Sequence, residues 1–202
     1  MNLPNQLTLL RMGLAFAMPV FLLTDFPFSK TLALLVFVIA SITDYWDGRL
    51  ARTRCGISTF GQLMDPLADK ILVCSVFICF VAQDQIVPAW IVIVIISREF
   101  MVTGLRLLAA NQGRIIPAGR WGKHKTVWQI VAIIAILVGE LVRNDLLPLL
   151  VSPKTLAPFL VLYYDPFFAY VTFAVTFWVA ALTVISGWVY FRECKDMVMK
   201  DA

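Results

Sequence analysis

Residues 41–70 read SITDYWDGRLARTRCGISTFGQLMDPLADK, and this stretch lies between two strongly apolar segments. It carries two pairs of aspartates: Asp44 and Asp47 follow the first apolar segment, and Asp65 and Asp69 precede the second. Spacings of three and four residues put the members of each pair on one face of a helix. We therefore expect two helices whose acidic ends lie at the same face of an apolar bundle.

The chain as a whole is too apolar for a soluble domain. Of its 202 residues, 60% are hydrophobic and only 15% are charged, whereas about a quarter are charged in a typical soluble domain. This composition excludes a disordered chain, a collagen-like chain and a basic nucleic-acid-binding arm. An integral membrane protein with the lipid bilayer as a partner, and with no nucleic-acid partner, is the class that remains.

The apolar segments predict an all-α fold, with residues 1–202 forming a single domain that is a bundle of six transmembrane helices. A short amphipathic surface helix over about residues 2–11 precedes the bundle, since leucines recur there at helical spacing. A span needs about 20 residues, so helices with shorter apolar runs must continue through charged residues. The predicted membrane segments are about 12–28, 30–51, 62–83, 86–109, 122–142 and 167–191.

Basic residues predict the orientation in the membrane. They gather in alternate connections and after the last segment: Arg49, Arg52, Arg54, Arg106, Arg114, Arg120, Lys123, Lys125, Arg192, Lys195 and Lys200. By the positive-inside rule these loops and both termini face the cytoplasm. We expect a multi-pass protein of the cell membrane (inner or plasma membrane) whose active site opens to the cytoplasmic face.

The opposite face is expected to be simpler. The connection 143–166 contains several prolines, which predicts an irregular external loop. Glu140 and Asp145, near the external end of the fifth segment, are expected to be solvated. Aromatic residues of the last segment are expected to pack or to form an interfacial belt; they are Trp178, Trp188, Tyr190 and Phe191.

The four aspartates indicate a metal site. Like charges beside hydrocarbon repel one another and are costly to desolvate, so one or two divalent cations are the natural compensation. Hard oxygen ligands favour Mg²⁺ or Mn²⁺. The alternative is that the acids cap helices or pair with neighbouring basic residues, which are Arg49, Arg52 and Lys70.

Small residues accompany the acids. Gly48 and Ala51 leave a shallow groove after the first acidic pair, and Gly61 precedes the second pair. A planar base or a pyrophosphate could approach the backbone there, with Arg52 placed to meet a phosphate. Helix packing or a turn is the alternative for each glycine taken alone.

A basic cluster lies farther along the chain. Arg98 and Arg106 share one face of the fourth segment, and Lys123 and Lys125 begin the fifth from the same side. Such a collection suits an anionic acceptor, most simply a phosphate monoester. The alternative is that Arg106 and the lysines contact anionic lipid under the positive-inside rule.

Eight residues of the acidic stretch together resemble a family signature. They read Asp44-x2-Asp47-Gly48-x2-Ala51-Arg52-x8-Gly61-x3-Asp65-x3-Asp69. This pattern is similar, at every fixed position, to the signature of the CDP-alcohol phosphotransferases. The resemblance covers nearly the whole chain and implies a six-helix bundle, often a homodimer, with a polar cavity open to the cytoplasm.

The resemblance also implies roles for these residues. Two metal ions would be bound by Asp44, Asp47, Asp65 and Asp69. Asp69 would in addition act as the general base. The cytidine nucleotide site would be lined by Gly48, Ala51, Arg52 and Gly61.

Three further stretches resemble the bacterial members of this family that make phosphatidylglycerol phosphate. They are NLPNQLTLLR (residues 2–11), ISREFMVTGLRLLAANQG (96–113) and GKHKTVWQ (122–129). This similarity implies CDP-diacylglycerol as donor, sn-glycerol 3-phosphate as acceptor, and CMP as the second product. The acceptor phosphate would bind the basic cluster. Asn5, Thr8 and Arg11 would help to hold the donor diphosphate, or would anchor the first turn at the headgroups.

Two other functions stay open. A sister enzyme would have the same chemistry with another acceptor, such as inositol phosphate, serine or phosphatidylglycerol. A cation transporter would use the four acids as a transport site, although their position at one face argues against a site at the membrane midplane. Release of CMP separates the enzymes from the transporter, and a screen of acceptors separates the enzymes from each other.

Overall fold

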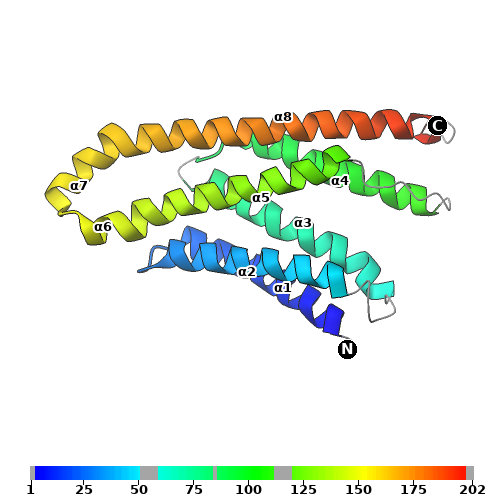
Figure 1. Cartoon of the computed structure of the whole chain (residues 1–202), viewed down its shortest axis with the longest axis horizontal. Coiled ribbons are helices and arrows are strands. Elements are labelled where there is room, and N and C mark those ends of the chain that lie inside the picture. The colour runs from blue at the N-terminus through cyan, green and yellow to red at the C-terminus, as the bar shows by residue number, and fades with distance from the viewer. Residues whose placement is uncertain (1–2, 51–58, 84–85, 112–119, 199–202) are drawn as a thin grey trace.

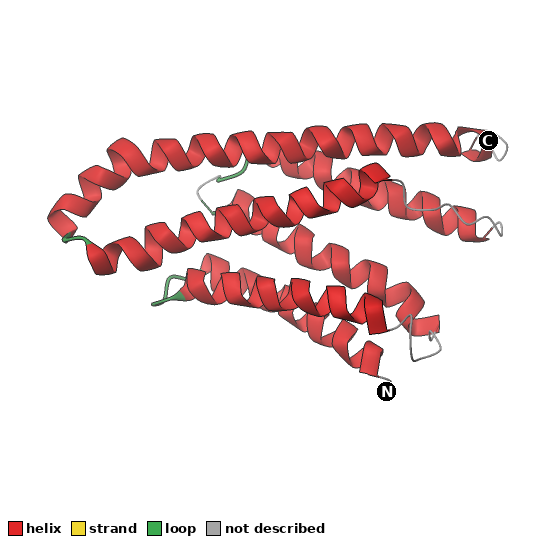
Figure 2. Cartoon of the chain, viewed as in Figure 1, coloured by secondary structure: helices red, strands yellow, loops and turns green. Residues whose placement is uncertain are grey.

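The structure is a computed structural model of the chain that describes residues 3–50, 59–83, 86–111 and 120–198. Every regular element in these ranges is a helix, which confirms the predicted all-α class (Figure 2). The long helices are α1 (Leu3–Leu23), α2 (Ser29–Leu50), α3 (Thr59–Ala82), α4 (Ala89–Asn111), α5 (Arg120–Leu141) and α8 (Asp165–Val198).

Successive long helices run in opposite directions along the long axis of the molecule (Figure 1). The N-terminus, the end of α2, the start of α3, the end of α4 and the C-terminus lie toward the right-hand end of the bundle in this view. The turn between α5 and α8 forms the other end. The helices that carry the acidic pairs therefore bring them to the end of the bundle where α4 finishes.

The first helix, α1, is continuous where the sequence predicts a surface helix followed by a separate span. It packs against α2 and α3. Its buried face is formed by Arg11, Ala15, Met18 and Leu22, at the spacing of a single helix face. The two predicted parts thus form one helix. That residues 2–11 lie on the membrane surface stays a prediction.

The connection between α5 and α8 is helical, so the prediction of an irregular loop over 143–166 is wrong. It consists of η1 (Val142–Leu146), α6 (Leu147–Leu150), α7 (Pro153–Phe159) and η2 (Leu160–Tyr164). Pro153 is the first residue of α7, where a helix needs no backbone N–H donor. Pro148 is the second residue of α6, which follows η1 directly, and Pro158 lies inside α7. The prolines of this connection therefore do not exclude helices.

One helical stretch of the described chain, Pro153–Arg192, is long and apolar enough to cross a membrane, with a mean hydropathy of 2.0. Other apolar stretches in the described residues are shorter: Leu9–Leu23, Ser29–Thr43 and Lys70–Ala82. As predicted, α2 continues as a helix through Asp44 and Asp47 to Leu50. The full set of six spans stays a prediction.

The core lies between the long helices and includes large side chains from several of them. Met18, Phe37, Phe77, Phe80, Ile91 and Ile133 are fully buried. The rings of Phe77 and Phe80 meet edge to face, with centroids 6.3 Å apart. Large apolar side chains also cover the outside of the bundle, among them Phe16, Ile93, Phe167 and Trp188, which suits contact with lipid.

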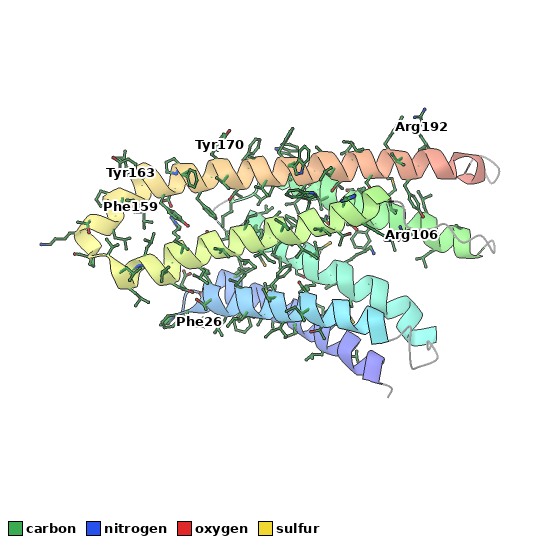
Figure 3. The ribbon with its side chains drawn as sticks, in the orientation of Figure 1. Phe26, Arg106, Phe159, Tyr163, Tyr170 and Arg192 are labelled. Atoms are coloured by element: carbon green, nitrogen blue, oxygen red, sulfur yellow. The ribbon has the colours of Figure 1, made fainter. Side chains whose placement is uncertain are left out.

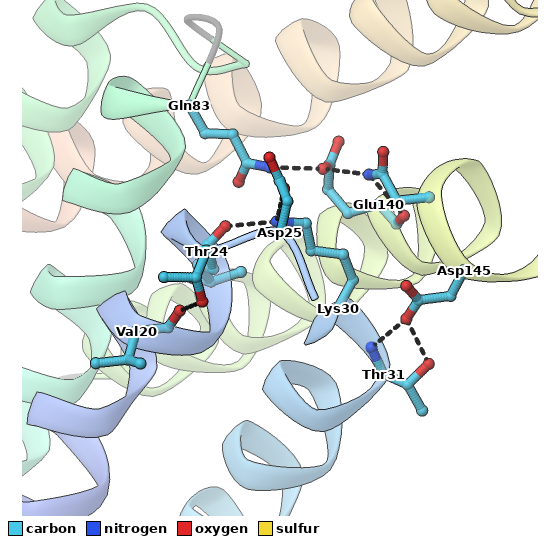
Figure 4. A network of polar contacts seen from close by, with 10 residues as sticks. Val20, Thr24, Asp25, Lys30, Thr31, Gln83, Glu140 and Asp145 are labelled. Atoms are coloured by element: carbon cyan, nitrogen blue, oxygen red, sulfur yellow. Dashed lines mark hydrogen bonds and ion pairs between the residues drawn. The ribbon is translucent and has the colours of Figure 1, made fainter. Parts of the chain in front are cut away.

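A polar network joins helices near the α6–α7 end (Figure 4). The ammonium group of Lys30 donates to the carbonyl oxygen of Leu22 at 2.6 Å. One carboxylate oxygen of Asp145 accepts the backbone N–H of Thr31 at 2.7 Å and its hydroxyl at 2.6 Å. These bonds link the start of α2 to the end of α1 and to η1.

Glu140 is only 2% exposed, so the prediction that it is solvated is wrong. Its carboxylate accepts hydrogen bonds from the side-chain amides of Gln83 at 3.1 Å and Asn144 at 3.0 Å. The prediction for Asp145 is wrong as well, because this residue is partly buried and bonded to Thr31. Protein donors replace water at both carboxylates, as buried polar groups require.

Gly139 of α5 lies against the Phe168 ring of α8. A Cβ atom at this position would come within 2.0 Å of the ring of Phe168. The ring stacks on Tyr164 at a centroid distance of 5.8 Å. The hydroxyl of Tyr164 in turn donates to the carbonyl oxygen of Gly139 at 2.7 Å. The Phe168 ring is therefore held against Gly139 on both sides and has little room to move.

We expect Gly139→Ala to destabilise the protein by about 1–3 kcal/mol, the usual cost of overpacking. The thermal unfolding midpoint of the purified protein in detergent measures this loss. Gly13→Ala is the matched control, since a Cβ at Gly13 meets no heavy atom within 4 Å and alanine favours the helix. A midpoint in Gly139→Ala as high as in Gly13→Ala would contradict the close approach.

Candidate functional site

The two acidic pairs occupy the facing ends of consecutive helices. Asp44 and Asp47 lie in the last two turns of α2, and Asp65 and Asp69 lie in the first three turns of α3. Both pairs keep the helical spacing that puts their members on one face. Their side chains lie outside the part that the structure describes, so the metal site stays a prediction.

The oxygen ligands fit a hard divalent cation in type and in number. Carboxylates are preferred ligands of Mg²⁺ and Mn²⁺, and the helices supply four of them over two neighbouring ends. Among the described side chains, no group of three or more His, Cys, Asp or Glu residues lies together. The side chains of the acidic pairs are not among those described. The sequence predicts these four aspartates as the ligands.

The predicted nucleotide residues are only partly covered by the structure. Gly48 and Gly61 lie within α2 and α3, next to the acidic pairs. Ala51 and Arg52 lie outside the described residues. Asn5 and Thr8 lie on α1, but their side chains are also outside the described part. Their roles at the donor therefore stay predictions.

Among the residues predicted to bind the lipid donor, Arg11 has a side chain that the structure describes. Arg11 is only 2% exposed. It belongs to the face of α1 that packs against α2 and α3, the helices with the acidic pairs. Burial of a guanidinium is costly unless anionic groups or hydrogen bonds compensate its charge. Arg11 faces the inside of the bundle and not the solvent; its predicted role at the donor diphosphate stays a prediction.

Arg98 and Arg106 lie on the same face of α4, as predicted, and this face packs against α8. A terminal nitrogen of Arg98 donates to the hydroxyl of Ser186 at 2.6 Å. The Nε–H of Arg106 donates to the hydroxyl of Tyr190 at 3.1 Å. A groove of about 500 Å³ lies beside Arg98 between the two helices. The structure thus brings the two arginines together along one side of α8.

The two lysines of the basic cluster differ from each other. Lys123 is exposed, whereas Lys125 is buried and forms an ion pair with Glu99. The same oxygen of Glu99 lies 3.6 Å from a terminal nitrogen of Arg98. Glu99 therefore neutralises two members of the predicted cluster, and its carboxylate ties α4 to α5.

Acidic and basic parts of the candidate site lie toward the same end of the bundle. Figure 3 shows Arg106 toward this end, with Phe26, Phe159 and Tyr163 toward the opposite end. The structure shows the shared end, and a common cavity stays a prediction.

Two residues of α8 are absent from the sequence-based site. Ser186 and Tyr190 contact the arginines of α4, although Tyr190 is expected from sequence to be a packing or belt residue. A serine and a tyrosine on an apolar helix are the only signal that the sequence offers for them. The register between α4 and α8, which pairs each hydroxyl with its arginine, cannot be read from one sequence.

Comparisons with known proteins give similarity over nearly the whole chain. The family described as CDP-alcohol phosphatidyltransferase matches residues 1–189. A protein of Bacillus subtilis (strain 168) named CDP-diacylglycerol--glycerol-3-phosphate 3-phosphatidyltransferase is 39% identical over 205 residues, covering 95% of this chain and 94% of the relative. A protein of the same name from Rickettsia bellii (strain RML369-C) is 34% identical over 200 residues, covering 96% of each chain.

Proposed function

The chain belongs to the CDP-alcohol phosphatidyltransferase family, and we propose that it transfers the phosphatidyl group of CDP-diacylglycerol to sn-glycerol 3-phosphate. The products are phosphatidylglycerol phosphate and CMP. The observation that carries this proposal is the arrangement of α2, α3 and α4, whose acidic and basic residues lie toward one end of the bundle. The names of the full-length relatives support the choice of donor and acceptor.

The family is generally dependent on a divalent metal. In our proposal Asp44, Asp47, Asp65 and Asp69 hold Mg²⁺ or Mn²⁺, with two ions shared among the four carboxylates. Bound there, the metal would supply positive charge that offsets the donor diphosphate and the leaving CMP. The aspartates supply the oxygen ligands, and the helix ends of α2 and α3 fix the spacing within each pair.

The reaction is a displacement at phosphorus. A hydroxyl oxygen of the acceptor attacks the phosphorus that bears the diacylglycerol, and the bond from that phosphorus to CMP breaks. Asp69 takes the proton of the attacking hydroxyl. A carboxylate is a weak base in water, so its position against the hydroxyl must make it effective. A helix inside a packed bundle is a suitable support for such a position.

The donor is held on the acidic side of the site. Arg11 faces α2 and α3 from the buried side of α1, where its charge suits the diphosphate. Thr8 and Asn5 lie about one and two turns earlier on the same helix. In our proposal Gly48, Ala51, Arg52 and Gly61 line the cytidine nucleotide site, where small residues let the ligand approach the backbone.

The acceptor phosphate is held on the basic side. Arg98 and Arg106 are fixed on one face of α4. A guanidinium group can donate two parallel hydrogen bonds to the oxygens of a phosphate. Lys123 is exposed and free to approach the same anion. Lys125 forms an ion pair with Glu99 and so offsets the charge of the carboxylate that lies 3.6 Å from Arg98. This group of charges favours a phosphate-bearing acceptor over a neutral alcohol.

The setting that we propose is the cell membrane, crossed by six helices, with the termini and the site facing the cytoplasm. The apolar outer surface of the bundle and the long apolar stretch Pro153–Arg192 support this setting. A homodimer is also part of the proposal, because the family resemblance implies one.

Acceptor dependence tests the function. Purified protein supplied with CDP-diacylglycerol and Mg²⁺ is expected to release CMP when sn-glycerol 3-phosphate is added. Glycerol is the matched control acceptor, because it lacks the phosphate that the basic cluster binds. Turnover with inositol phosphate or serine, and none with glycerol 3-phosphate, would assign a sister enzyme. Absence of CMP release with every acceptor would contradict the whole family of reactions.

Asp69→Asn tests the general base. The change keeps the size of the side chain and an oxygen ligand but removes most of its proton affinity. Because general-base catalysis contributes about 10²–10⁴-fold, we expect CMP release to fall by at least about 100-fold. Binding of the donor should weaken less than in Asp44→Asn or Asp65→Asn. A residual rate above about a tenth of the wild-type rate would reassign the role.

A further inference from the structure

Two hydroxyl groups of α8 contact the two arginines of α4. The hydroxyl oxygen of Ser186 accepts a hydrogen bond from a terminal nitrogen of Arg98 at 2.6 Å. The hydroxyl oxygen of Tyr190 accepts the Nε–H of Arg106 at 3.1 Å. The guanidinium carbon of Arg106 also lies 5.3 Å from the centroid of the Tyr190 ring. Each arginine thus has its own partner, one helical turn apart on α8.

These partners are rigid because they are buried. Ser186 is 4% exposed and Tyr190 is 5% exposed. Gly187 lies between them, and a Cβ atom there would come within 3.1 Å of the Cγ atom of Arg98. The absence of a side chain at Gly187 therefore lets the stem of Arg98 lie against α8. The close packing at Gly187 and the hydrogen bond to Ser186 both restrict Arg98.

Other buried hydroxyls of α8 behave differently. The hydroxyl of Thr176 donates to the carbonyl oxygen of Thr172 at 2.7 Å, and that of Thr183 donates to the carbonyl oxygen of Val179 at 2.7 Å. These threonines satisfy their hydroxyls within their own helix, as is usual for such residues. Ser186 and Tyr190 instead turn their oxygen atoms to a neighbouring helix. Their contacts are specific to the arginines and are not a general property of α8.

The contact with Tyr190 leaves donors of Arg106 available for an anion. A guanidinium has five N–H donors, and Tyr190 accepts only the one on Nε of Arg106. Among the described residues, no other hydrogen bond to Arg106 is found, so its two terminal nitrogens can still donate to a ligand. At Arg98, Ser186 accepts from one terminal nitrogen, and the other lies 3.6 Å from Glu99.

We propose that Ser186 and Tyr190 are positioning residues that hold Arg98 and Arg106 in the orientation that binds the acceptor phosphate. The inference rests on the proposed function, because it deepens the acceptor site of that reaction. A free arginine side chain has several rotatable bonds and loses that freedom on binding. By fixing the guanidinium groups beforehand, α8 lowers the cost of binding the acceptor. The last helix then contributes to acceptor affinity although it carries no signature residue.

The test uses Tyr190→Phe, which keeps the ring over Arg106 and removes only the hydroxyl. We expect KM for sn-glycerol 3-phosphate to rise about 3- to 10-fold, as fits the loss of one hydrogen bond. The kcat value and the KM for CDP-diacylglycerol should stay within about twofold of wild type. Tyr170→Phe is the matched control, because Tyr170 lies on the same helix and is 73% exposed. Its KM values should not change.

Ser186 is tested in the same way. Ser186→Ala should raise the KM for glycerol 3-phosphate, and Ser186→Thr, which restores a hydroxyl, should return it toward the wild-type value. Thermal unfolding midpoints, measured in detergent for every variant, identify a variant that has merely lost its fold. Equal rises in KM for both substrates, or a fall in kcat alone, would overturn the positioning role.

A double-mutant cycle shows whether Tyr190 acts through Arg106. In an Arg106→Gln background, Tyr190→Phe should have no further effect on the KM for glycerol 3-phosphate. An undiminished effect in that background would overturn the assignment of Tyr190. Normal wild-type turnover with unchanged KM in Tyr190→Phe and Ser186→Ala would overturn this inference alone. Absence of wild-type turnover with glycerol 3-phosphate would overturn the proposed function, and this inference with it.

Discussion

The position of four aspartates in the adjoining ends of α2 and α3 is the constraint on which the proposed site depends. Four carboxylates on two consecutive helices need cations and water at one end of an otherwise apolar bundle. Since the helices alternate in direction, the end of α4 lies toward that same end (Figure 1). The opposite end carries charges that are paired within the protein, such as Arg143 with Asp165 at 2.8 Å. We therefore propose the end with the acidic pairs as the place where a charged ligand binds.

The sequence predicts the long helices well because their apolar runs are marked by charged or turn residues. It also predicts that α2 continues through Asp44 and Asp47, since the apolar run before them is too short to span a bilayer. It fails at 143–166, where Pro153 begins α7, Pro148 is the second residue of α6 and Pro158 lies inside α7. Position within a helix, which decides what a proline does, cannot be read from composition.

At the candidate site, sequence predicts residue types better than partners. The shared face of Arg98 and Arg106 follows from helical periodicity and is found in the structure. Their contacts with Ser186 and Tyr190 depend on the register between α4 and α8, which periodicity does not contain. The same limit applies to Glu140, whose carboxylate accepts hydrogen bonds from Asn144 in the next turn and from Gln83, 57 residues away in the sequence.

The central claim is that a divalent cation binds at the end of the bundle where α2 ends and α3 begins. Mn²⁺ is paramagnetic, so it broadens the signal of a nearby spin label. A label on Lys123→Cys, at the start of α5, and one on Lys154→Cys, in α7, can be compared after the four native cysteines are replaced by alanine. We expect saturable broadening by Mn²⁺ at position 123 and none at position 154, with the effect lost in Asp44→Asn. Broadening at position 154 alone, or equal broadening at both positions that survives Asp44→Asn, would contradict the account.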